Sequence, residues 1–495
     1  MACFPGEASS SAPAIRGCPP AAARLTLAGT GRGGGVTVAD DLDELIVALP
    51  DGRVITDPDI IEAYRRDETA AVAPGQPRCV VSARSTDEVT ATMRWASVHR
   101  VPVVPRGGGS GLAGGAAGID GCVLLSLARM NTILELDPVN ELAVAGAGVI
   151  NADLDRAAAA HGLMYPPDPS SYEISTIGGN LATNAGGLRC VKYGVTRDAV
   201  LGLEVVLADG RVLRTGRRTI KGVAGYDLTS LFVGSEGTLG VITSATLRLR
   251  PRPAAPPATV AASFPSFGAA ARAVTAILQA RLQPSLLELM DRATLRAIDD
   301  WKHLGFGDEV QALLIAQDDT DDAARRAGLM RDLCLEHGAS LADVSASEAE
   351  SQQLLDIRRM AYPATERLGA NLVEDVCVPR SLLPDMVERI ERAADRHGVR
   401  IATVAHAGDG NLHPVFIYDR ALAGSEQVPD SVWAAADEVF RAAIELGGTL
   451  TGEHGVGLIK RRWLALELGE DAMAVHRTIK AALDPAGILN PGKVF

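Results

Sequence analysis

The sequence lacks the cysteine pattern of a disulfide-bonded domain or of a cysteine-ligated metal site. Only seven cysteines occur in 495 residues, and no two of them stand at a C-x-x-C distance. This odd and scattered set fits neither a disulfide framework nor a cysteine-ligated zinc or iron–sulfur site. We therefore expect a protein of a reducing compartment.

Long apolar runs and an excess of basic residues are also missing. No run approaches the roughly 18 to 20 apolar residues that span a bilayer, so we predict no transmembrane segment. Acidic residues outnumber basic ones by 61 to 48, a formal net charge of -13. Because nucleic-acid binding needs clustered Lys and Arg, this balance argues against a nucleic-acid surface. We expect a cytoplasmic protein, free or peripheral at a membrane, or a mitochondrial one if the source is eukaryotic.

The first forty residues lack the apolar core of a secretion signal. They are rich in Ala, Ser, Pro and Gly, and they contain only one acid, Glu7, before Asp40. This composition faintly resembles a transit peptide, but it buries too little apolar surface to order itself. We predict that residues 1–40 are a disordered or misassigned tail. With 47% hydrophobic and 22% charged residues, the whole chain has the composition of a globular protein with two or more domains.

Glycine, in contrast, is abundant, with 51 residues, and it gathers in runs at residues 106–115, 176–187 and 234–240. Glycines permit positive φ and let a pyrophosphate approach the main chain, so a phosphate cradle competes with a plain surface loop as the interpretation. The first run contains a G-x-G-x-x-G spacing, but the residues up to Gly121 are too broken for the helix that a Rossmann unit requires. Several such runs favour a long dinucleotide held in a cradle of another kind.

Hydrophobic periodicity predicts strands and helices on both sides of a proline-rich break. Before the break it predicts helical structure over residues 41–67, a capped helix from Thr86 to about His99 and a strand over residues 200–208. Four prolines between residues 251 and 257 mark a domain boundary, because proline stiffens the chain and removes ladder donors. Beyond it strands and helices alternate without a glycine cradle, as in an α+β layer, so we expect the substrate site there.

A second group of polar residues follows later in the chain. The sequence around residues 408–411 predicts a strand, a tight turn and a second strand. A hairpin around that turn places His406 and His413 nearly opposite each other, where both imidazoles reach one metal ion. Glu453 and His454 follow on a glycine-flanked loop. A His, His and Glu set with an open fourth position is typical of a catalytic divalent metal site.

Each of these residues also has a plainer interpretation. An isolated histidine is more often a core or surface residue than a ligand, but three of nine histidines here gather in two glycine-flanked segments. His454 points away from Glu453 if the loop is extended, so we expect an acid or base role for it rather than a ligand role. Arg358 binds a substrate carboxylate if it faces the site. On the sequence alone, an exposed helix arginine is the favoured alternative.

Seven motifs together resemble the FAD-linked D-2-hydroxy acid dehydrogenases, from about Asp41 to the C-terminus. They are Pro105-Arg-Gly-Gly-Gly-Ser-Gly111, Pro166-Pro-Asp-Pro-Ser170, Ile177-Gly-Gly-Asn-Leu-Ala-Thr-Asn-Ala-Gly-Gly187, Gly234-Ser-Glu-Gly-Thr-Leu-Gly240, His406-Ala-Gly-Asp-Gly-Asn-Leu-His413, Gly452-Glu-His-Gly455 and Ile488-Leu-Asn-Pro-Gly-Lys493. The resemblance implies an α+β fold of the vanillyl-alcohol-oxidase or PCMH type. Its parts would be a two-lobed FAD-binding domain at residues 41–252, an α+β cap or substrate domain at 253–480, and a segment at 481–495 that returns to the FAD domain.

The same resemblance implies that the first glycine run holds the FAD pyrophosphate and that other segments line the rest of the cofactor. The implied FAD-binding residues are Pro105, Arg106, Gly107, Gly108, Gly109, Ser110, Gly111, Leu112, Pro167, Asp168, Thr176, Ile177, Gly178, Gly179, Ala182, Gly187, Glu236, Gly240, Ile242 and Asn490. Some related flavoproteins attach FAD through a histidine in the phosphate loop. Ser110 and Gly111 stand there in this chain, so we expect non-covalent FAD.

For the reaction, the resemblance implies a divalent ion, Zn2+ or Mn2+, bound by His406, His413 and Glu453, which lowers the pKa of the substrate hydroxyl. His454 accepts the hydroxyl proton while a hydride passes to flavin N5. The implied substrate-binding residues are Arg358, Tyr362 and His454.

The substrate class follows from departures within the family. Enzymes for D-2-hydroxyglutarate carry a Lys shortly before the Asp-x-(Ser/Cys)-x-Pro segment and a polar residue two positions after the second metal-site His, where this chain has Val373 and Val415. We expect D-lactate or glycolate as substrate, with D-2-hydroxyglutarate as the alternative. We also expect a quinone-linked, cytochrome or electron-transfer protein as electron acceptor, and a homodimer. The alternative functions from other classes are a metal-dependent hydrolase with the His, His and Glu site and a non-catalytic flavoprotein.

Overall fold

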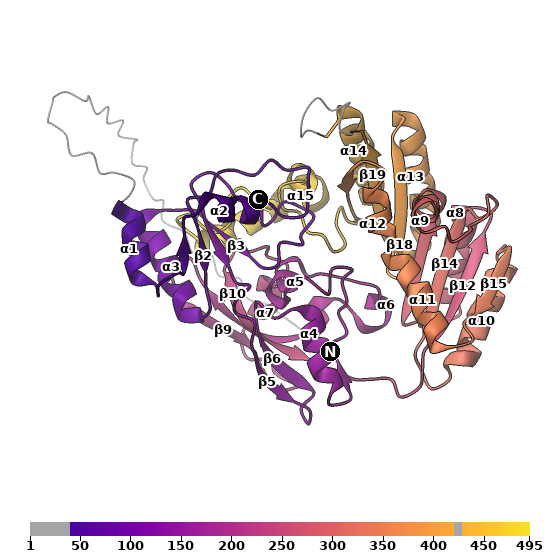
Figure 1. Cartoon of the computed structure of the whole chain (residues 1–495), viewed down its shortest axis with the longest axis horizontal. Coiled ribbons are helices and arrows are strands. Elements are labelled where there is room, and N and C mark those ends of the chain that lie inside the picture. The colour runs from indigo at the N-terminus through magenta and orange to yellow at the C-terminus, as the bar shows by residue number, and fades with distance from the viewer. Residues whose placement is uncertain (1–39, 420–427) are drawn as a thin grey trace, which may run out of the picture.

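In this computed structural model, which describes residues 40–419 and 428–495, the strands gather into four sheets (Figure 1). A four-stranded sheet, a five-stranded sheet and a two-stranded ribbon come from the first half of the chain, and an eight-stranded sheet comes from the second. Helices and strands are therefore mixed in both halves. This arrangement confirms the predicted α+β class.

The four-stranded sheet leads into the first glycine run. Its strands, in spatial order, are β1 (Val54–Ile55), β2 (Cys79–Ser82), β4 (Val123–Ser126) and β3 (Val103–Arg106). β4 pairs in parallel with both β2 and β3, and its apolar residues are fully buried, as is usual in parallel sheets. α3 (Thr86–His99) connects β2 to β3, and the Ser85 side chain caps it by accepting from the Glu88 N–H. The predicted capped helix is confirmed.

The five-stranded antiparallel sheet supports the second glycine run. Its spatial order is β5 (Ile133–Asp137), β6 (Leu142–Gly146), β10 (Val241–Arg248), β8 (Val200–Val206) and β9 (Val212–Gly216). The second glycine run forms the short helix α5 (Ile177–Thr183), which packs against β6 and β10. Its Ile177 and Leu181 belong to the core of this sheet. The predicted strand at 200–208 is present and ends two residues early.

The eight-stranded antiparallel sheet carries helices on both faces. Its strands are β15 (Leu341–Val344), β12 (Ala258–Phe264), β14 (Ala312–Asp318), β13 (Leu286–Asp291), β18 (Arg400–His406), β19 (Asn411–Tyr418) and β16 (Ala370–Val373), with β17 (Val376–Cys377) beside β19. One face packs on α8 (Phe267–Gln279), α10 (Ala323–Glu336), α13 (Leu383–His397) and α14 (Asp430–Glu445). The other packs on α9 (Arg292–Lys302), α11 (Glu348–Arg359) and α12 (Ala361–Glu366).

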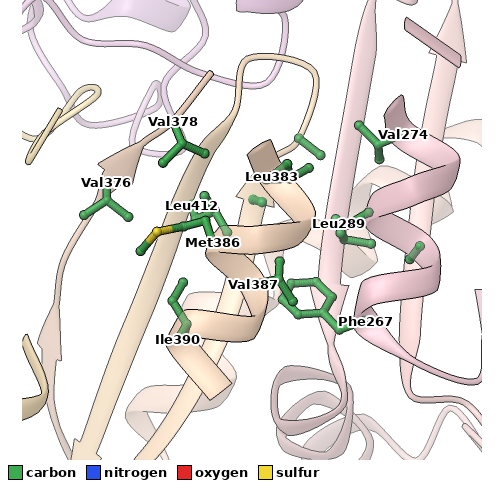
Figure 2. Packing of buried hydrophobic residues seen from close by; sticks show 14 of the residues in the cluster. Phe267, Val274, Leu289, Val376, Val378, Leu383, Met386, Val387, Ile390 and Leu412 are labelled. Atoms are coloured by element: carbon green, nitrogen blue, oxygen red, sulfur yellow. The ribbon is translucent and has the colours of Figure 1, made fainter. Parts of the chain in front are cut away.

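Alternation along β13 shows how the large sheet fills both of its cores. Leu287 and Leu289 lie in the core beneath α8 and α13, whereas Leu286 and Met290 lie in the core beneath α9 and α12. Figure 2 shows part of the first core, where the apolar side of α13 faces Phe267 and Leu289. A strand buried on both faces leaves little room for charge, so a carboxylate in its middle needs partners.

The C-terminal residues join the four-stranded sheet. α15 (Arg461–Leu483) bends at Gly469, whose φ is 75. Leu489 then forms a parallel bridge with Val103 of β3. The Asn490 side chain donates to the carbonyl oxygens of Gly115 and Glu236. Residues 488–490 therefore lie against the glycine runs, while the domain limits given above stay predictions.

The helical prediction for residues 41–67 was wrong in its middle. α1 (Asp40–Ala48) and α2 (Pro58–Tyr64) are separated by β1, because Gly52 turns the chain with a φ of 72 and Val54–Ile55 pairs with β2. The remaining short elements are α4 (Asn151–Ala159), β7 (Leu163–Met164), α6 (Cys190–Tyr193), η1 (Thr196–Ala199), α7 (Leu228–Phe232), β11 (Arg250–Pro251) and η2 (Arg380–Leu382).

Two further expectations concern the N-terminal tail and transmembrane helices. The predicted tail, residues 1–40, lies outside the described residues except for Asp40, which begins α1. Among the helices of residues 40–419 and 428–495, none combines the length and the apolar composition that a bilayer crossing requires.

Candidate active site

A cavity of about 420 Å³ brings together the glycine runs and the polar residues of the large sheet. The first glycine run, α5 and the segment from Glu236 to Ile242 line one part of it. His413, Glu453, His454, Arg358 and Tyr362 line another part. The first glycine run and His454, which are far apart in the sequence, thus line one space.

The first glycine run lines the cavity because its backbone lies directly against the start of α5. A Cβ on Gly107 would overlap the Oγ1 of Thr176, and one on Gly108 would lie 2.5 Å from the carbonyl oxygen of Ile174. Gly109 has a φ of 80, which favours glycine. At the head of the run, Arg106 lines the cavity and its buried Nη1 has no hydrogen-bond partner. A glycine-lined wall beside an unpartnered guanidinium nitrogen fits a pyrophosphate.

The predicted FAD-binding residues divide into two groups by position. Those that line the cavity are Pro105, Arg106, Gly107, Gly108, Gly109, Ser110, Gly111, Leu112, Thr176, Gly178, Gly179, Ala182, Glu236, Gly240 and Ile242. Those that do not are Pro167, Asp168, Ile177, Gly187 and Asn490. Members of the second group make other contacts. For example, Ile177 is fully buried in the core and Asp168 accepts a hydrogen bond from the Arg189 N–H.

Glu236 joins the glycine wall to the loop that carries Glu453 and His454. Its two carboxylate oxygens accept from the N–H groups of Val456, at 2.8 Å, and Gly457, at 2.9 Å. Burial raises the pKa of Glu236 to about 7, although these two hydrogen bonds oppose the rise. The sequence assigned Glu236 to the cofactor, but the position of this side chain also fixes the loop of the polar cluster.

The two histidines of the hairpin are diagonal neighbours and not opposite each other. In the register of β18 and β19, His406 faces Asn411 and His413 faces Val404. The predicted pairing was wrong because the turn comprises residues 407–410, so Asn411 already belongs to the strand. The rings still meet on one face of the sheet, with centroids 4.9 Å apart in an edge-to-face arrangement.

Glu453 completes a cluster that suits a divalent ion. Its Oε1 lies 3.4 Å from His406 Nε2 and 3.3 Å from His413 Nε2, and one ligand atom from each of the three residues lies within 4.8 Å of the others. His413 Nε2 is buried and has no hydrogen-bond partner. Convergent imidazole nitrogens and a carboxylate, with one nitrogen unpartnered, are a donor set for zinc or manganese.

The charges around the cluster favour a cation. Burial lowers the pKa of His406, but Glu288 and Glu453 outweigh this effect and raise it to about 10. Burial alone would raise the pKa of Glu453, but the histidines lower it to about 2. Burial keeps the pKa of His413 well below its ordinary value, which leaves its imidazole neutral. The carboxylates of Glu288 and Glu453, which hold a proton on His406, attract other positive charge as well. A divalent ion bound to His406 would supply such charge in place of one proton of the ring.

His454 lies at the edge of the same cluster. Its ring centroid is 5.0 Å from that of His413, and its Nε2 is 3.9 Å from Glu453 Oε1. The expectation that His454 points away from Glu453 was wrong, because the loop is turned and not extended, with Gly455 at a φ of 86. Burial lowers the pKa of His454, so the imidazole is neutral and able to accept a proton.

Asp375 holds the loop of Glu453 and His454 in place. Its Oδ2 accepts from the N–H groups of Gly452 and Glu453, and its Oδ1 lies 3.6 Å from His454 Nδ1. Asp375 also pairs with the buried Lys460. Burial raises the pKa of Asp375, but the charge of Lys460 outweighs it and keeps this pKa far below its ordinary value. Asp375 stands in the Asp-x-(Ser/Cys)-x-Pro segment, and no role was predicted for it, because its loop partners lie about 80 residues away.

Arg358 is buried and not an exposed helix arginine. It is 5% exposed, lines the cavity from α11, and its Nε donates to Glu288 Oε2 at 2.7 Å. Tyr362 lines the cavity from α12. Sequence reasoning missed Glu288. The available signal was a single acidic residue in the apolar strand Leu286-Leu287-Glu288-Leu289-Met290.

The rest of the wall near Arg358 is largely apolar. Val373, Val404 and Val415 line it from the large sheet. Arg359 lines the cavity as well, and its guanidinium lies 5.3 Å from the centre of the Tyr172 ring. Apolar side chains from the large sheet and a second arginine therefore line the same cavity as the polar cluster.

Known sequences match both halves of this chain. Residues 77–216 match the family described as "FAD binding domain", and residues 255–494 match "FAD linked oxidases, C-terminal domain". The chain is 44% identical over 422 residues to glycolate oxidase subunit GlcD of Bacillus subtilis, covering 85% of this chain and 89% of the relative. It is 37% identical to D-lactate dehydrogenase of Archaeoglobus fulgidus and 34% identical to D-2-hydroxyglutarate dehydrogenase of Stutzerimonas stutzeri, each covering 92% of this chain and 98% of the relative.

Comparison with solved structures concerns the fold alone. The 4-ethylphenol oxidase of Gulosibacter chungangensis superposes with a TM-score of 0.74 at 21% identity, and p-cresol methylhydroxylase with a TM-score of 0.74 at 18% identity. Each match covers 92% of this chain and 96% of the other. The predicted vanillyl-alcohol-oxidase or PCMH-type architecture is thereby confirmed.

Proposed function

This chain belongs to the FAD-linked 2-hydroxy acid dehydrogenases, and from that premise we propose that it oxidises a small D-2-hydroxy acid, D-lactate or glycolate, to the 2-oxo acid. The observation that carries the proposal is one cavity that joins the glycine wall beside Arg106 to the cluster of His413, Glu453 and His454. Neither a hydrolase nor a binding protein accounts for both halves of that cavity.

The glycine wall would hold FAD. His406, His413 and Glu453 would hold a divalent ion. When bound, FAD accepts a hydride at N5 and the ion polarises the substrate hydroxyl. Ser110 stands where a histidine would be needed for covalent attachment, so we propose non-covalent FAD.

His454 is the proposed base. Its Nδ1 faces Asp375 Oδ1 at 3.6 Å, so a proton on Nδ1 is favoured and Nε2 is left to accept the proton of the substrate hydroxyl. The low pKa that burial gives His454 keeps this nitrogen unprotonated before substrate binds. Asp375 then stabilises the imidazolium that forms.

Arg358 is the proposed carboxylate-binding residue. Its Nε is occupied by Glu288, which leaves the Nη groups for the substrate carboxylate. Val373 and Val415 favour a short substrate side chain over a second carboxylate. The second candidate substrate, D-2-hydroxyglutarate, is supported by Arg359, which could pair with a distal carboxylate at the border of the cavity. For reoxidation, we propose a quinone-linked, cytochrome or electron-transfer protein acceptor.

Anaerobic flavin reduction tests this function. Purified protein is expected to carry flavin absorbance that bleaches with D-lactate or glycolate and less with D-2-hydroxyglutarate. A colourless protein, or a flavin that no 2-hydroxy acid reduces, would contradict the proposal. His454→Ala is expected to keep FAD and lose substrate reduction, whereas His161→Ala, at an exposed position, is expected to behave like the wild type. Ester hydrolysis by flavin-free protein would favour the hydrolase instead.

A further inference from the structure

Glu288 is a buried carboxylate that lies outside the set of proposed ion ligands. It lies in the middle of β13, and its side chain is completely shielded from solvent. The neighbouring strand places His406 directly opposite Glu288 in the antiparallel register. A carboxylate in such a position destabilises the fold unless it is paired, so its partners indicate what it does.

The two partners of Glu288 belong to two different parts of the site. His406 Nδ1 lies 2.8 Å from Oε1 and 3.0 Å from Oε2. Arg358 Nε donates to Oε2 at 2.7 Å. One carboxylate therefore contacts both a residue of the metal-binding cluster and the arginine that lines the substrate space.

We propose that Glu288 is a positioning residue that couples the divalent-ion site to the carboxylate-binding site, an inference that rests on the proposed function. By accepting from Nδ1, Glu288 fixes the ring of His406 and directs Nε2 toward Glu453 and His413. By accepting from Nε, it fixes the plane of the Arg358 guanidinium, so the remaining N–H groups keep one orientation toward the cavity.

The coupling follows from sharing a single group. A shift of Arg358 toward a substrate moves or unpairs the oxygen that also holds His406, and a shift of His406 toward an ion does the reverse. By thermodynamic linkage, the factor by which a bound substrate changes the affinity for the ion equals the factor by which the ion changes the affinity for the substrate. Ion affinity is therefore expected to depend on Arg358, although no ligand atom of the cluster belongs to it.

Zinc affinity, measured by chelator competition on the FAD-loaded full chain, tests the inference. Glu288→Gln offers one acceptor oxygen to two donors, so we expect about 10- to 100-fold weaker Zn2+ binding, the usual cost of losing such an outer partner. We also expect a higher KM for D-lactate. The matched control is Asp318→Asn, which removes a buried carboxylate of the same sheet whose partner, Arg326 at 2.6 Å, does not line the cavity.

A second variant separates positioning from folding. Arg358→Gln is expected to weaken Zn2+ binding in the wild-type background and to have little further effect when combined with Glu288→Gln, as coupled residues do in a double-mutant cycle. If Glu288→Gln does not fold, Arg358→Gln alone decides: weaker Zn2+ binding supports the inference, and unchanged binding overturns it.

The remaining outcomes are equally decisive. Three results would overturn the coupling. The first is an unchanged Zn2+ affinity in Glu288→Gln, and the second is an equal loss of Zn2+ affinity in Asp318→Asn. The third is a wild type that binds neither Zn2+ nor Mn2+. If the variants behave as expected but no 2-hydroxy acid reduces the flavin of the wild type, the proposed function fails and the positioning role of Glu288 stands.

Discussion

Replacing Glu236 by glutamine is expected to change how the stability of this protein depends on pH. Glu236 is buried, and both of its oxygens accept from backbone N–H groups of the loop beyond Glu453. Burial raises its pKa from 4.5 to about 7 in the folded protein. Glutamine has nearly the same shape and stays neutral at every pH, so the variant isolates the titration of this one carboxyl.

The sign and size of the effect follow from the shift. A carboxyl whose pKa is raised by folding contributes its full stability below pH 4.5 and loses it as the pH rises through about 7. Between pH 5 and pH 8 this loss amounts to about 2 to 3 kcal/mol of unfolding free energy. The stability of the wild type minus that of Glu236→Gln is therefore expected to fall by this amount across that interval.

Urea unfolding followed by circular dichroism at pH 5, 6, 7 and 8 measures the difference. The matched control is Glu204→Gln on β8. Burial raises the pKa of Glu204, but hydrogen bonds from Thr86 and Arg214 outweigh burial, so the pKa lies below 4.5 in the folded protein. The stability of the wild type minus that of Glu204→Gln is therefore expected to stay constant from pH 5 to pH 8. A flat difference for Glu236→Gln as well would refute the reasoning, because it would mean that burial does not hold a proton on Glu236.

Three other predictions concern the glycine wall, the loop and the ion site. Gly107→Ala places a methyl group against Thr176, the cap of α5, at a cost of about 1 to 3 kcal/mol; fluorescence titration is expected to show FAD affinity at least about tenfold weaker, and unchanged affinity would contradict the cradle. Asp375→Asn removes the nearer carboxylate from the buried Lys460 and leaves it Glu374 at 3.4 Å. We therefore expect the unfolding free energy in urea to fall by about 3 kcal/mol, and a fall below about 1 kcal/mol would contradict this. Removing the ion from the cluster with a chelator is expected to abolish substrate reduction while flavin absorbance stays, and joint loss of flavin would show that the two sites are not separate.

Local patterns in the sequence were enough for much of the fold. The cap at Ser85 and the alternation of strands and helices after residue 257 are determined by neighbours in the chain, and α3 and the large sheet follow from them. The error in residues 41–67 has the same origin. Val54 and Ile55 have apolar side chains that fit a helix pattern, but pairing with the distant strand β2 decides their conformation. The helix α5 within the second glycine run was not predicted.

The three proposed ion ligands could be predicted from the sequence, whereas the residues that position them could not. His406, His413 and Glu453 stand out because histidine and glycine-flanked acids are scarce and typical of ion sites. Glu288 is marked only as a single acid in an apolar strand, and Asp375 only as part of a short motif. Neither signal indicates a role, because the roles depend on strand register and on a loop about 80 residues away. The diagonal placement of the two histidines likewise depends on the length of the turn, which residue types alone do not fix.

The bridge between Leu489 and Val103 has a consequence for biosynthesis. Gly115, at the end of the first glycine run, is translated 375 residues before Asn490, whose side chain donates to its carbonyl oxygen. A nascent chain on the ribosome therefore carries an incomplete wall until residues 488–490 have been made, after the whole large sheet. We therefore expect FAD to be held at full affinity only after residues 488–490 have been translated and have folded against the first glycine run.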